Sequence, residues 1–177
     1  MRKLKITELN RVSKEEYKHI DKLPLVVVLD EVRSLYNVGS VFRSSDAFAV
    51  SAVYLCGITA VPPHPEIHKT ALGAEDSVDW KYFKYTQDAV NELKREGYEV
   101  LSVEQVEHST LLQHIDLDAN KKYAIILGNE VKGVQQEVVN MCDGCIEIPQ
   151  FGTKHSLNVS VTAGILIWEF SRHLKLD

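Results

Sequence analysis

The sequence predicts a three-layer α/β/α domain with a mainly parallel β-sheet. Apolar, β-branched runs of strand length alternate with amphipathic helical segments, as in folds whose crossover helices cover both faces of a parallel sheet. Polar segments follow three of these runs, and ligands of such sheets bind outside the carboxyl ends of the strands. We therefore expect one domain with a ligand site along one edge of its sheet.

Length and composition are those of an ordinary globular chain. The 177 residues are 45% hydrophobic and 25% charged, enough for one domain with a sizeable core. The first ten residues contain no apolar run and no apolar stretch is long enough to cross a bilayer, so we expect a cytoplasmic protein without a membrane partner. We place the main domain at residues 24–177.

Charge is distributed unevenly along the chain. The net charge of −5 argues against indiscriminate nucleic-acid binding, which usually shows a basic excess. Residues 1–22, however, carry seven basic and four acidic side chains. That excess fits either a local nucleic-acid contact or a solvated helix face, and we describe residues 1–23 as a basic helical extension.

Cysteine and histidine spacing does not predict a metal site. Cys142 and Cys145 have the spacing of a redox pair or half a zinc site, but there is no second pair, and simple packing explains them better. His64 and His68 are four residues apart, but prolines on both sides of His64 disfavour a helix there and no third ligand is evident. We expect no bound metal.

The expected elements begin with a short helix. Ser13 and Glu16 have the pattern of a capping box, and Pro24 is expected to end this helix. Residues 25–29 are a continuous Leu and Val run, typical of a strand buried on both faces. Further strands are expected at 53–57, 78–83, 98–103, 123–127 and 145–148, a loop with a short turn at 62–74, and helices at 86–96 (capped by Thr86), 135–141 and 159–174.

The first polar cluster follows the strand at 25–29. A helix is expected to begin near Asn37, and service as its N-cap is a sufficient explanation for that residue. Arg43 lies two turns further on, directly after the apolar Val41 and Phe42. On a helix that must be mostly buried, we expect Arg43 to be buried and to need a carboxylate or phosphate partner.

The second and third clusters follow later strands. Two glycines bracket a polar turn at 128–133, so the backbone can approach a ligand closely there, and Glu130 stands beside an apolar strand end. In the third cluster Ser156, Asn158 and Ser160 alternate at the start of the last helix, where free N–H groups favour a ligand. A helix cap needs one such residue, so capping and a ligand site remain alternatives here.

Together the three clusters resemble the motifs of the SpoU (TrmH-like) family of RNA ribose 2′-O-methyltransferases, within the SPOUT class. Residues 37–43 resemble the first motif, 127–133 the second and 148–160 the third, in the family's order and spacing. Gln150 stands where a methionine is common, and Lys154-His155 stand where many members have other residues. These departures bear on the choice of substrate more than on the class of reaction.

The resemblance implies a deep trefoil knot formed by the C-terminal segment (the α/β-knot fold) and a homodimer with its active site at or near the subunit interface. It implies S-adenosylmethionine held by the knot loops, with structured RNA, either tRNA or rRNA, as the substrate. Backbone groups around Gly128, Ile148 and Leu157, together with Ser156, would hold the cofactor. Val103 would line its adenine side.

The same resemblance assigns Arg43 the central role in methyl transfer to a ribose 2′-hydroxyl. A guanidinium is a poor general base because its pKa exceeds about 12. We therefore expect Arg43 to hold the target phosphate and to stabilise the developing alkoxide, while the proton passes to a phosphate oxygen or water. The side chains of Asn37, Glu130, Ser156 and Asn158 would orient Arg43, the ribose and the cofactor.

Two other functions compete with the methyltransferase. A non-catalytic RNA-binding or assembly protein would keep the same knotted fold, but the intact Arg43, Asn37, Glu130 and Asn158 favour an enzyme. A small-molecule dehydrogenase would need a G-x-G-x-x-G segment after the first strand, which the sequence lacks.

The last expected helix is apolar nearly all round. Leu166, Ile167, Trp168 and Phe170 add to the apolar residues of its first two turns. In so small a domain, such a helix predicts an isologous dimer in which it covers a second copy as well as its own sheet.

Overall fold

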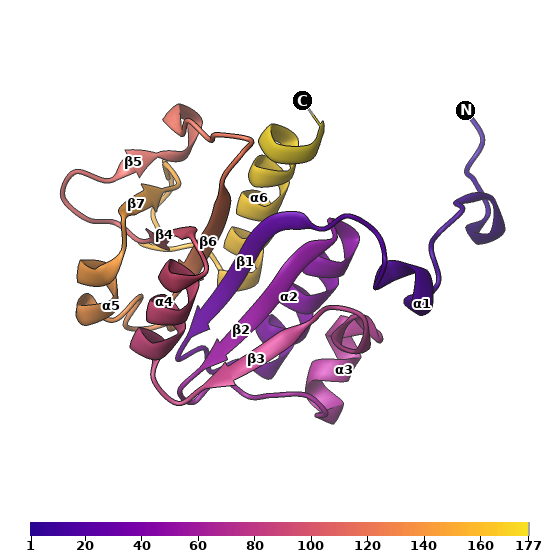
Figure 1. Ribbon diagram of the computed structural model, residues 1–177, viewed down its shortest axis with the longest axis horizontal. Helices are drawn as coiled ribbons and strands as arrows, with labels where there is room; N and C mark the ends of the chain where they lie inside the picture. The colour runs from indigo at the N-terminus through magenta and orange to yellow at the C-terminus, as the bar shows by residue number, and fades with distance from the viewer. Residues whose placement is uncertain (177) are drawn as a thin grey trace.

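The computed structural model describes residues 1–176, except for the side chains of Ile6 and Leu176. Its middle layer is a seven-stranded sheet in which every pair of neighbours is parallel, in the order β3-β2-β1-β6-β4-β7-β5 (Figure 1). The strands are β1 (Leu23–Asp30), β2 (Val50–Cys56), β3 (Trp80–Phe83), β4 (Tyr98–Val103), β5 (Thr110–Leu111), β6 (Lys122–Leu127) and β7 (Gly144–Glu147).

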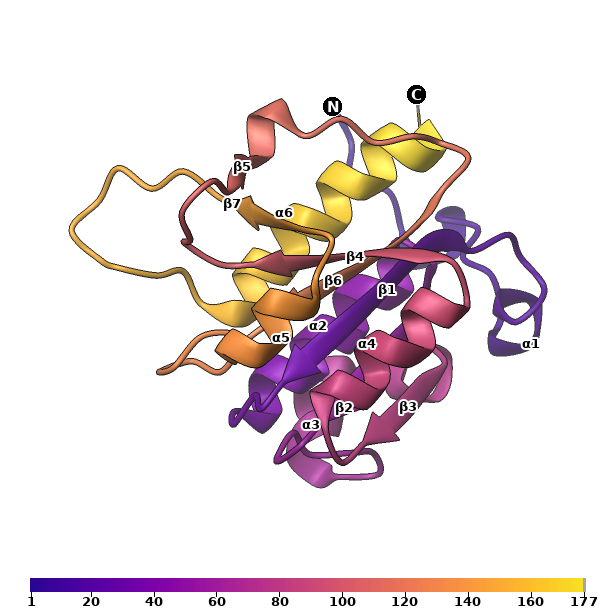
Figure 2. The same cartoon turned by 60° about the vertical axis from the view of Figure 1, so that its left-hand side comes forward.

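Helices cover both faces of the sheet (Figures 1 and 2). One face carries α2 (Leu35–Ala47), α3 (Pro65–Ala71) and α6 (Val159–Ser171), and the other carries α4 (Thr86–Arg95) and α5 (Gln136–Met141). A short π-helix, Arg172–Leu176, continues α6, and α1 (Lys14–Tyr17) precedes the sheet. The predicted three-layer architecture with a parallel sheet is confirmed.

The core explains the central place of β1. Leu25, Val27 and Leu29 face the α2 and α6 side, whereas Val26 and Val28 face the α4 and α5 side. All five are buried, as expected for a strand covered on both faces, and each burial contributes about 1.5–3 kcal/mol.

The N-terminal segment is less helical than expected. Ser13 and Glu16 form the predicted capping box, but α1 ends at Tyr17, and Pro24 lies inside β1. Tyr17 is buried against the core, and an ion pair of 2.7 Å joins Lys14 to Asp76. These contacts fix residues 13–22 on the domain, while residues 1–12 extend away from it (Figure 1).

Two local predictions are wrong for identifiable reasons. Residues 65–71 form helix α3 instead of a loop, because Pro65 takes the first helical position, where a missing N–H costs nothing, and His64 caps it. Thr86 does not cap α4, since Tyr85 occupies the N-cap position. The Thr86 hydroxyl instead donates a hydrogen bond of 2.6 Å to the buried Asp30 carboxylate.

Strand β7 lies between β4 and β5, which both precede it in the chain. Val103 of β4 and Thr110 of β5 both align with Ile146 of β7, so the connection 104–109 spans the carboxyl end of β7. After β7 the chain runs through a long loop, 148–158, which projects from the body of the domain and leads into α6 (Figure 2). Within the described residues, no helix is long and apolar enough to cross a membrane.

Candidate functional site

The start of α2 differs from the sequence prediction. Ser34 caps the helix by accepting a hydrogen bond from the N–H of Asn37, so Asn37 is not the N-cap but lies inside the first turn. Asn37 is also buried. Its side chain is therefore available for contacts other than capping.

Glu130 uses its carboxylate to hold that helix start. Its Oε1 accepts hydrogen bonds from the N–H of Ser34 (3.0 Å) and from Nδ2 of Asn37 (3.1 Å), and its Oε2 accepts from the N–H of Arg33 (3.0 Å). Burial alone would raise the pKa of Glu130. The surrounding N–H donors outweigh burial and lower that pKa below its ordinary value, so Glu130 is ionised at neutral pH.

Asn158 extends the same chain of hydrogen bonds into the third cluster. Its Oδ1 caps α6 by accepting from the N–H groups of Ser160 and Val161, and its Nδ2 donates to Oδ1 of Asn37 at 3.1 Å. These hydrogen bonds link all three polar clusters through Asn37. Asn37 is 93 residues from Glu130 and 121 residues from Asn158 along the chain. Asn158 is both a cap and a member of the site, so the two explanations are compatible.

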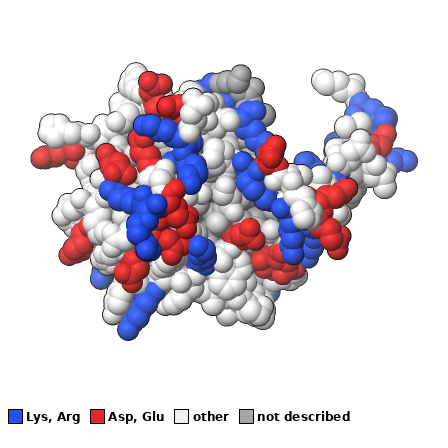
Figure 3. Space-filling view, in the orientation of Figure 1, with Lys and Arg blue, Asp and Glu red and all other residues white. Residues whose placement is uncertain are grey.

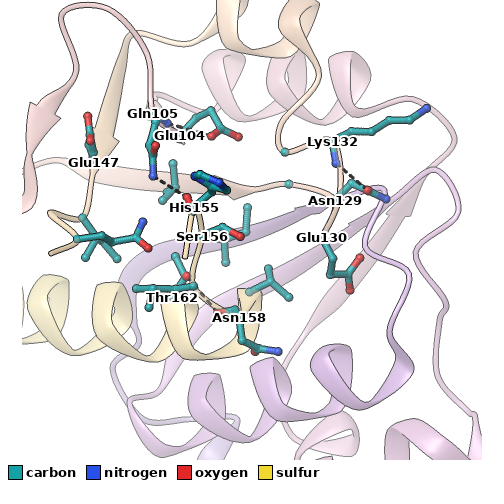
Figure 4. Close-up of a pocket in the computed structure, with 18 of the residues that line it drawn as sticks. Glu104, Gln105, Asn129, Glu130, Lys132, Glu147, His155, Ser156, Asn158 and Thr162 are labelled. Carbon is teal, nitrogen blue, oxygen red and sulfur yellow. Dashed lines mark hydrogen bonds between the residues drawn. The ribbon is translucent and has the colours of Figure 1, made fainter. Parts of the chain in front are cut away.

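A cavity of about 500 Å³ opens beside this network, at the carboxyl ends of β4, β6 and β7 and the start of α6 (Figure 4). That volume lies within the range of small-molecule sites. Glu130 and Asn158 line it, and so do all five residues predicted to hold a cofactor: Val103, Gly128, Ile148, Ser156 and Leu157.

Gly128 shows how tightly one wall of the cavity is built. A Cβ atom there would meet backbone atoms of Gly133 and Val134 at 2.1 Å, so only glycine fits. Gly133, on the opposite side of the turn, has a positive φ of 69°. Asn129 and Gly133 also exchange two backbone hydrogen bonds, which close the turn and present its edge to the cavity.

The lining is rich in carboxylates that the sequence prediction missed. Glu104 and Glu147 join Glu130 around the cavity, whereas Lys132 is a basic residue of the same lining whose side chain points outward in Figure 4. Each added carboxylate is held in place: Glu104 accepts from the N–H of Val134, and Glu147 accepts from the Ser109 hydroxyl. Both glutamates come at the end of a strand, so the rule that directed attention to Glu130 applied to them as well.

The loop between β7 and α6 is tied across the cavity mouth. The side-chain amide of Gln105 donates a hydrogen bond of 3.0 Å to the backbone carbonyl of His155. Gln105 and His155 both line the cavity, and Ser156 lies between His155 and the Asn158 cap (Figure 4). The loop thereby forms one wall of the cavity, although most of its side chains are exposed.

Arg43 is not part of this arrangement, and the expectation that it is buried is wrong. Arg43 is exposed, it does not line the cavity, and no described residue accepts a hydrogen bond from it. Flanking apolar residues are a poor guide on a helix, because each residue turns about 100° from the last. Val41 and Phe42 face the core, while Arg43 joins the exposed Tyr36 and Ala47 on the outer stripe of α2.

The two closely spaced cysteines behave as partly buried packing residues. Burial raises the pKa of the Cys142 thiol to about 11 and also raises that of Cys145, so both thiols stay protonated and weakly reactive. No group of three or more metal-ligating side chains occurs in the described part of the chain.

Comparison with known proteins identifies the family to which this geometry belongs. The model of the SpoU rRNA Methylase family matches residues 24–168. The chain belongs to this family. The resemblance inferred from the three motif segments is therefore confirmed.

Relatives of this SpoU family member are named as methyltransferases. It is 35% identical over 148 residues to the 23S rRNA (guanosine-2'-O-)-methyltransferase RlmB of Coxiella burnetii, a match covering 84% of this chain and 58% of that protein. It is 31% identical over 152 residues to a putative TrmH family tRNA/rRNA methyltransferase of Staphylococcus saprophyticus, covering 86% and 60%.

A solved structure agrees with the fold. The AdoMet-bound rRNA methyltransferase of Sinorhizobium meliloti superposes with a TM-score of 0.78 at 27% identity, covering 87% of this chain and 61% of that one. The SpoU family chain described here thus spans about three fifths of the length of these relatives.

Proposed function

We propose that this protein transfers a methyl group from S-adenosylmethionine to a ribose 2′-hydroxyl of structured RNA, either tRNA or ribosomal RNA, in the cytoplasm. The observation that carries the proposal is that two motif segments, 127–133 and 148–160, line one cavity beyond β4, β6 and β7, while Asn37 of the first segment is hydrogen-bonded to Glu130 and Asn158 of the other two. Membership of the SpoU family and the names of its relatives support the same reaction.

The cavity suits the mixed chemistry of this cofactor, which supplies an electrophilic methyl group when bound. Val103, Ile148 and Leu157 offer apolar surface for an adenine ring. Gly128 adds backbone polar groups to the lining, and Ser156 adds a hydroxyl. The glutamates of the lining complement the positive charge of a sulfonium.

Glu130, Asn37 and Asn158 act as positioning residues in this proposal. An ionised carboxylate with a lowered pKa is a weak general base, and its oxygens already accept three hydrogen bonds from the start of α2. Their task is to hold α2, the cavity and α6 in one geometry, which is a large part of catalysis by displacement. The hydroxyl proton passes to a phosphate oxygen of the RNA or to water.

Arg43 serves the site of a second subunit in this proposal. It lies six residues along α2 from Asn37, about 9 Å at 1.5 Å per residue, and it faces outward. The Arg43 side chain therefore does not point into the cavity of its own subunit. A guanidinium on the outer face of α2 is well placed to hold a target phosphate beside the cavity of a partner copy.

The outer face of α6 supports a homodimer. Val161, Ile165 and Trp168 recur at helical spacing and are each more than one third exposed, while Leu166 and Ile167 fill the core. The Trp168 ring packs edge-on against Phe48, the C-cap residue of α2, at 5.9 Å between centroids, so this stripe lies beside the C-terminal end of α2. An apolar stripe of this kind is a candidate for an isologous contact.

The path of the chain supports the trefoil knot. Because β7 lies between β4 and β5, the segment that leaves β7 has to cross the connection 104–109 before it reaches α6, which packs against β1 and α2. The hydrogen bond from Gln105 to His155 joins the two crossing segments. We propose that residues 148–158 are threaded through the earlier connection.

The N-terminal extension, residues 1–23, is proposed to add affinity for RNA. Figure 3 shows basic side chains along this extension with acidic ones among them, and the sequence gives residues 1–22 seven basic and four acidic side chains. A non-catalytic RNA-binding protein would share this feature. The intact network around the cavity favours the enzyme.

A transfer experiment separates the enzyme from the binder. The purified protein is incubated with total tRNA or total rRNA and S-adenosylmethionine carrying a labelled methyl group, and labelled nucleosides are identified. We expect a 2′-O-methylnucleoside, and no label when the target position is replaced by a 2′-deoxynucleotide. RNA binding without any transfer would support the non-catalytic alternative.

A further inference from the structure

Phe151 is the most exposed large apolar side chain of the described residues after Met1 at the chain terminus. Its exposed fraction is 98%. It lies in the loop between β7 and α6, one residue after Gln150 and four before His155, both of which line the cavity. The chain therefore holds an aromatic ring in water at the mouth of its candidate site.

The surroundings of Phe151 are polar and basic. Gln150, Thr153, Lys154 and His155 flank it, and no described residue accepts a hydrogen bond from the Lys154 ammonium group. A protein–protein interface usually has a contiguous apolar patch at its centre, where charged residues are rare. A single ring beside a lysine is instead the combination that binds single-stranded nucleic acid, in which a base stacks on the ring and a phosphate meets the cation.

The position of the loop says which base is involved. If the cavity holds the methyl donor, the acceptor ribose must reach its mouth, and the base of that nucleotide lies within one nucleotide length of the loop. We propose that Phe151 is a stacking platform for the base of the methylated nucleotide or its immediate neighbour, with Lys154 contacting the adjoining phosphate. This proposal rests on the methyltransferase function proposed above.

The loop is held at both ends and its tip is uncrowded, which suits such a task. The hydrogen bond from Gln105 fixes the backbone at His155, and Asn158 fixes the start of α6. Gly152, which follows Phe151, has no atom within 4 Å of the place where a Cβ would lie, so the tip is uncrowded. The ring can therefore adjust to a base without disturbing the cavity wall.

Three substitutions at Phe151 test the chemistry of the contact. Phe151→Ala and Phe151→Leu both remove the aromatic face, while Phe151→Trp keeps it. Base–aromatic stacking is worth about 1–3 kcal/mol, so we expect the first two variants to lose roughly 5- to 150-fold in kcat/KM for RNA. Phe151→Trp should stay close to wild type. Leucine restoring full activity would show simple apolar burial and overturn the proposal.

Controls separate stacking from other roles of the loop. S-adenosylmethionine affinity, melting temperature and dimer mass should be unchanged in all three variants. Tyr85→Ala removes another exposed ring, next to β3 at the far edge of the sheet, and should leave transfer unchanged. Loss of the dimer in Phe151→Ala would assign the ring to a subunit contact, and loss of cofactor affinity would assign it to the cavity; either result overturns the proposal.

A binding measurement keeps the test independent of catalysis. The added indole fluorescence of the Phe151→Trp variant should be quenched when total tRNA or rRNA binds, beyond the change seen in wild type. Quenching without methyl transfer by any form of the protein would uphold the stacking contact and reject the enzyme. Transfer by wild type and by Phe151→Ala at equal rates, without quenching, would do the reverse.

Discussion

The rim formed by the carboxyl ends of the strands is closed at one end and open at the other. Beyond β1 and β2, side chains satisfy the backbone: the Thr59 hydroxyl accepts from the N–H of Val32 and donates to the carbonyl of Leu29, and Glu31 accepts from the N–H of Ile58. Beyond β4, β6 and β7 lies the cavity of about 500 Å³.

The carboxylates of Asp30 and Glu130 illustrate the difference between the closed and the open end of the rim. Asp30, at the end of β1, is fully buried and accepts hydrogen bonds from the Thr86 hydroxyl and from the backbone and side chain of Gln135. Glu130, after β6, holds the start of α2 but remains exposed to the cavity. A polar residue after a parallel strand is thus not enough to mark a site; the site lies where such residues also border an open volume.

The largest expected effect is at Arg43, which lies outside the cavity of its own subunit. Arg43→Ala and Arg43→Lys should each lower single-turnover methyl transfer by roughly 100-fold or more, since lysine cannot reproduce the planar fork of a guanidinium. Affinity for S-adenosylmethionine and thermal melting should stay near wild type, because Arg43 is exposed and outside its own cavity. A well-folded Arg43→Ala protein with normal turnover would remove Arg43 from the mechanism.

Mixed dimers determine which subunit supplies Arg43. Arg43→Ala subunits are combined with Ser156→Trp subunits, in which an exposed residue of the lining is enlarged to fill the cavity. If Arg43 acts on its partner, the mixture regains transfer that neither variant has alone. An inactive mixture would mean that Arg43 serves its own subunit.

Substitutions at the closed end of the rim should lower the free energy of unfolding and leave the rate of methyl transfer nearly unchanged. Asp30→Ala leaves three buried or partly buried donors without their acceptor, so we expect a loss of about 2–3 kcal/mol in the free energy of unfolding. Asp116→Ala, at an exposed position, is the matched control. Urea denaturation measures both, and transfer per folded molecule of the Asp30 variant should remain within a few-fold of wild type.

The smallest expected effect is the pH-dependent contribution of Glu130 to the free energy of unfolding. Because the folded-state pKa of Glu130 is lowered, its contribution to stability is present above the ordinary value of 4.5 and is lost as pH falls through the folded-state pKa. Glu130→Gln should cost about 1 kcal/mol at pH 7, a small value because solvent reaches this carboxylate. The gap between wild type and variant should close in acid. Glu137→Gln, at an exposed position of α5, is the matched control. A gap independent of pH would mean that the charge of Glu130 is unimportant.

The sequence predicted the layers and the edge of the sheet on which the site lies, because strand runs and helical periodicity are local properties. It did not predict how the polar residues share their tasks. Ser34 and Asn37 are both good caps, and the path of the preceding loop selects Ser34, which frees Asn37 to bond with Glu130 and Asn158. That choice depends on contacts across 93 and 121 residues.

Other differences have the same origin. β5 has only two residues and is a strand solely because Ile146 and Glu147 of β7 lie beside it, so no local pattern announces it. The exposure of Arg43 follows from which side of α2 meets the sheet. The roles of the residues around the cavity and the knot are proposals.

The insertion of β7 between β4 and β5 also has a consequence for biosynthesis. Both neighbours leave the ribosome before β7 does, so the slot between them has to stay unfilled until residues 144–147 emerge. The last wall of the cavity, residues 155–158, follows later still. A nascent chain therefore carries an incomplete sheet and an unfinished cavity through most of its translation, and the cavity is complete only when the final helix has emerged.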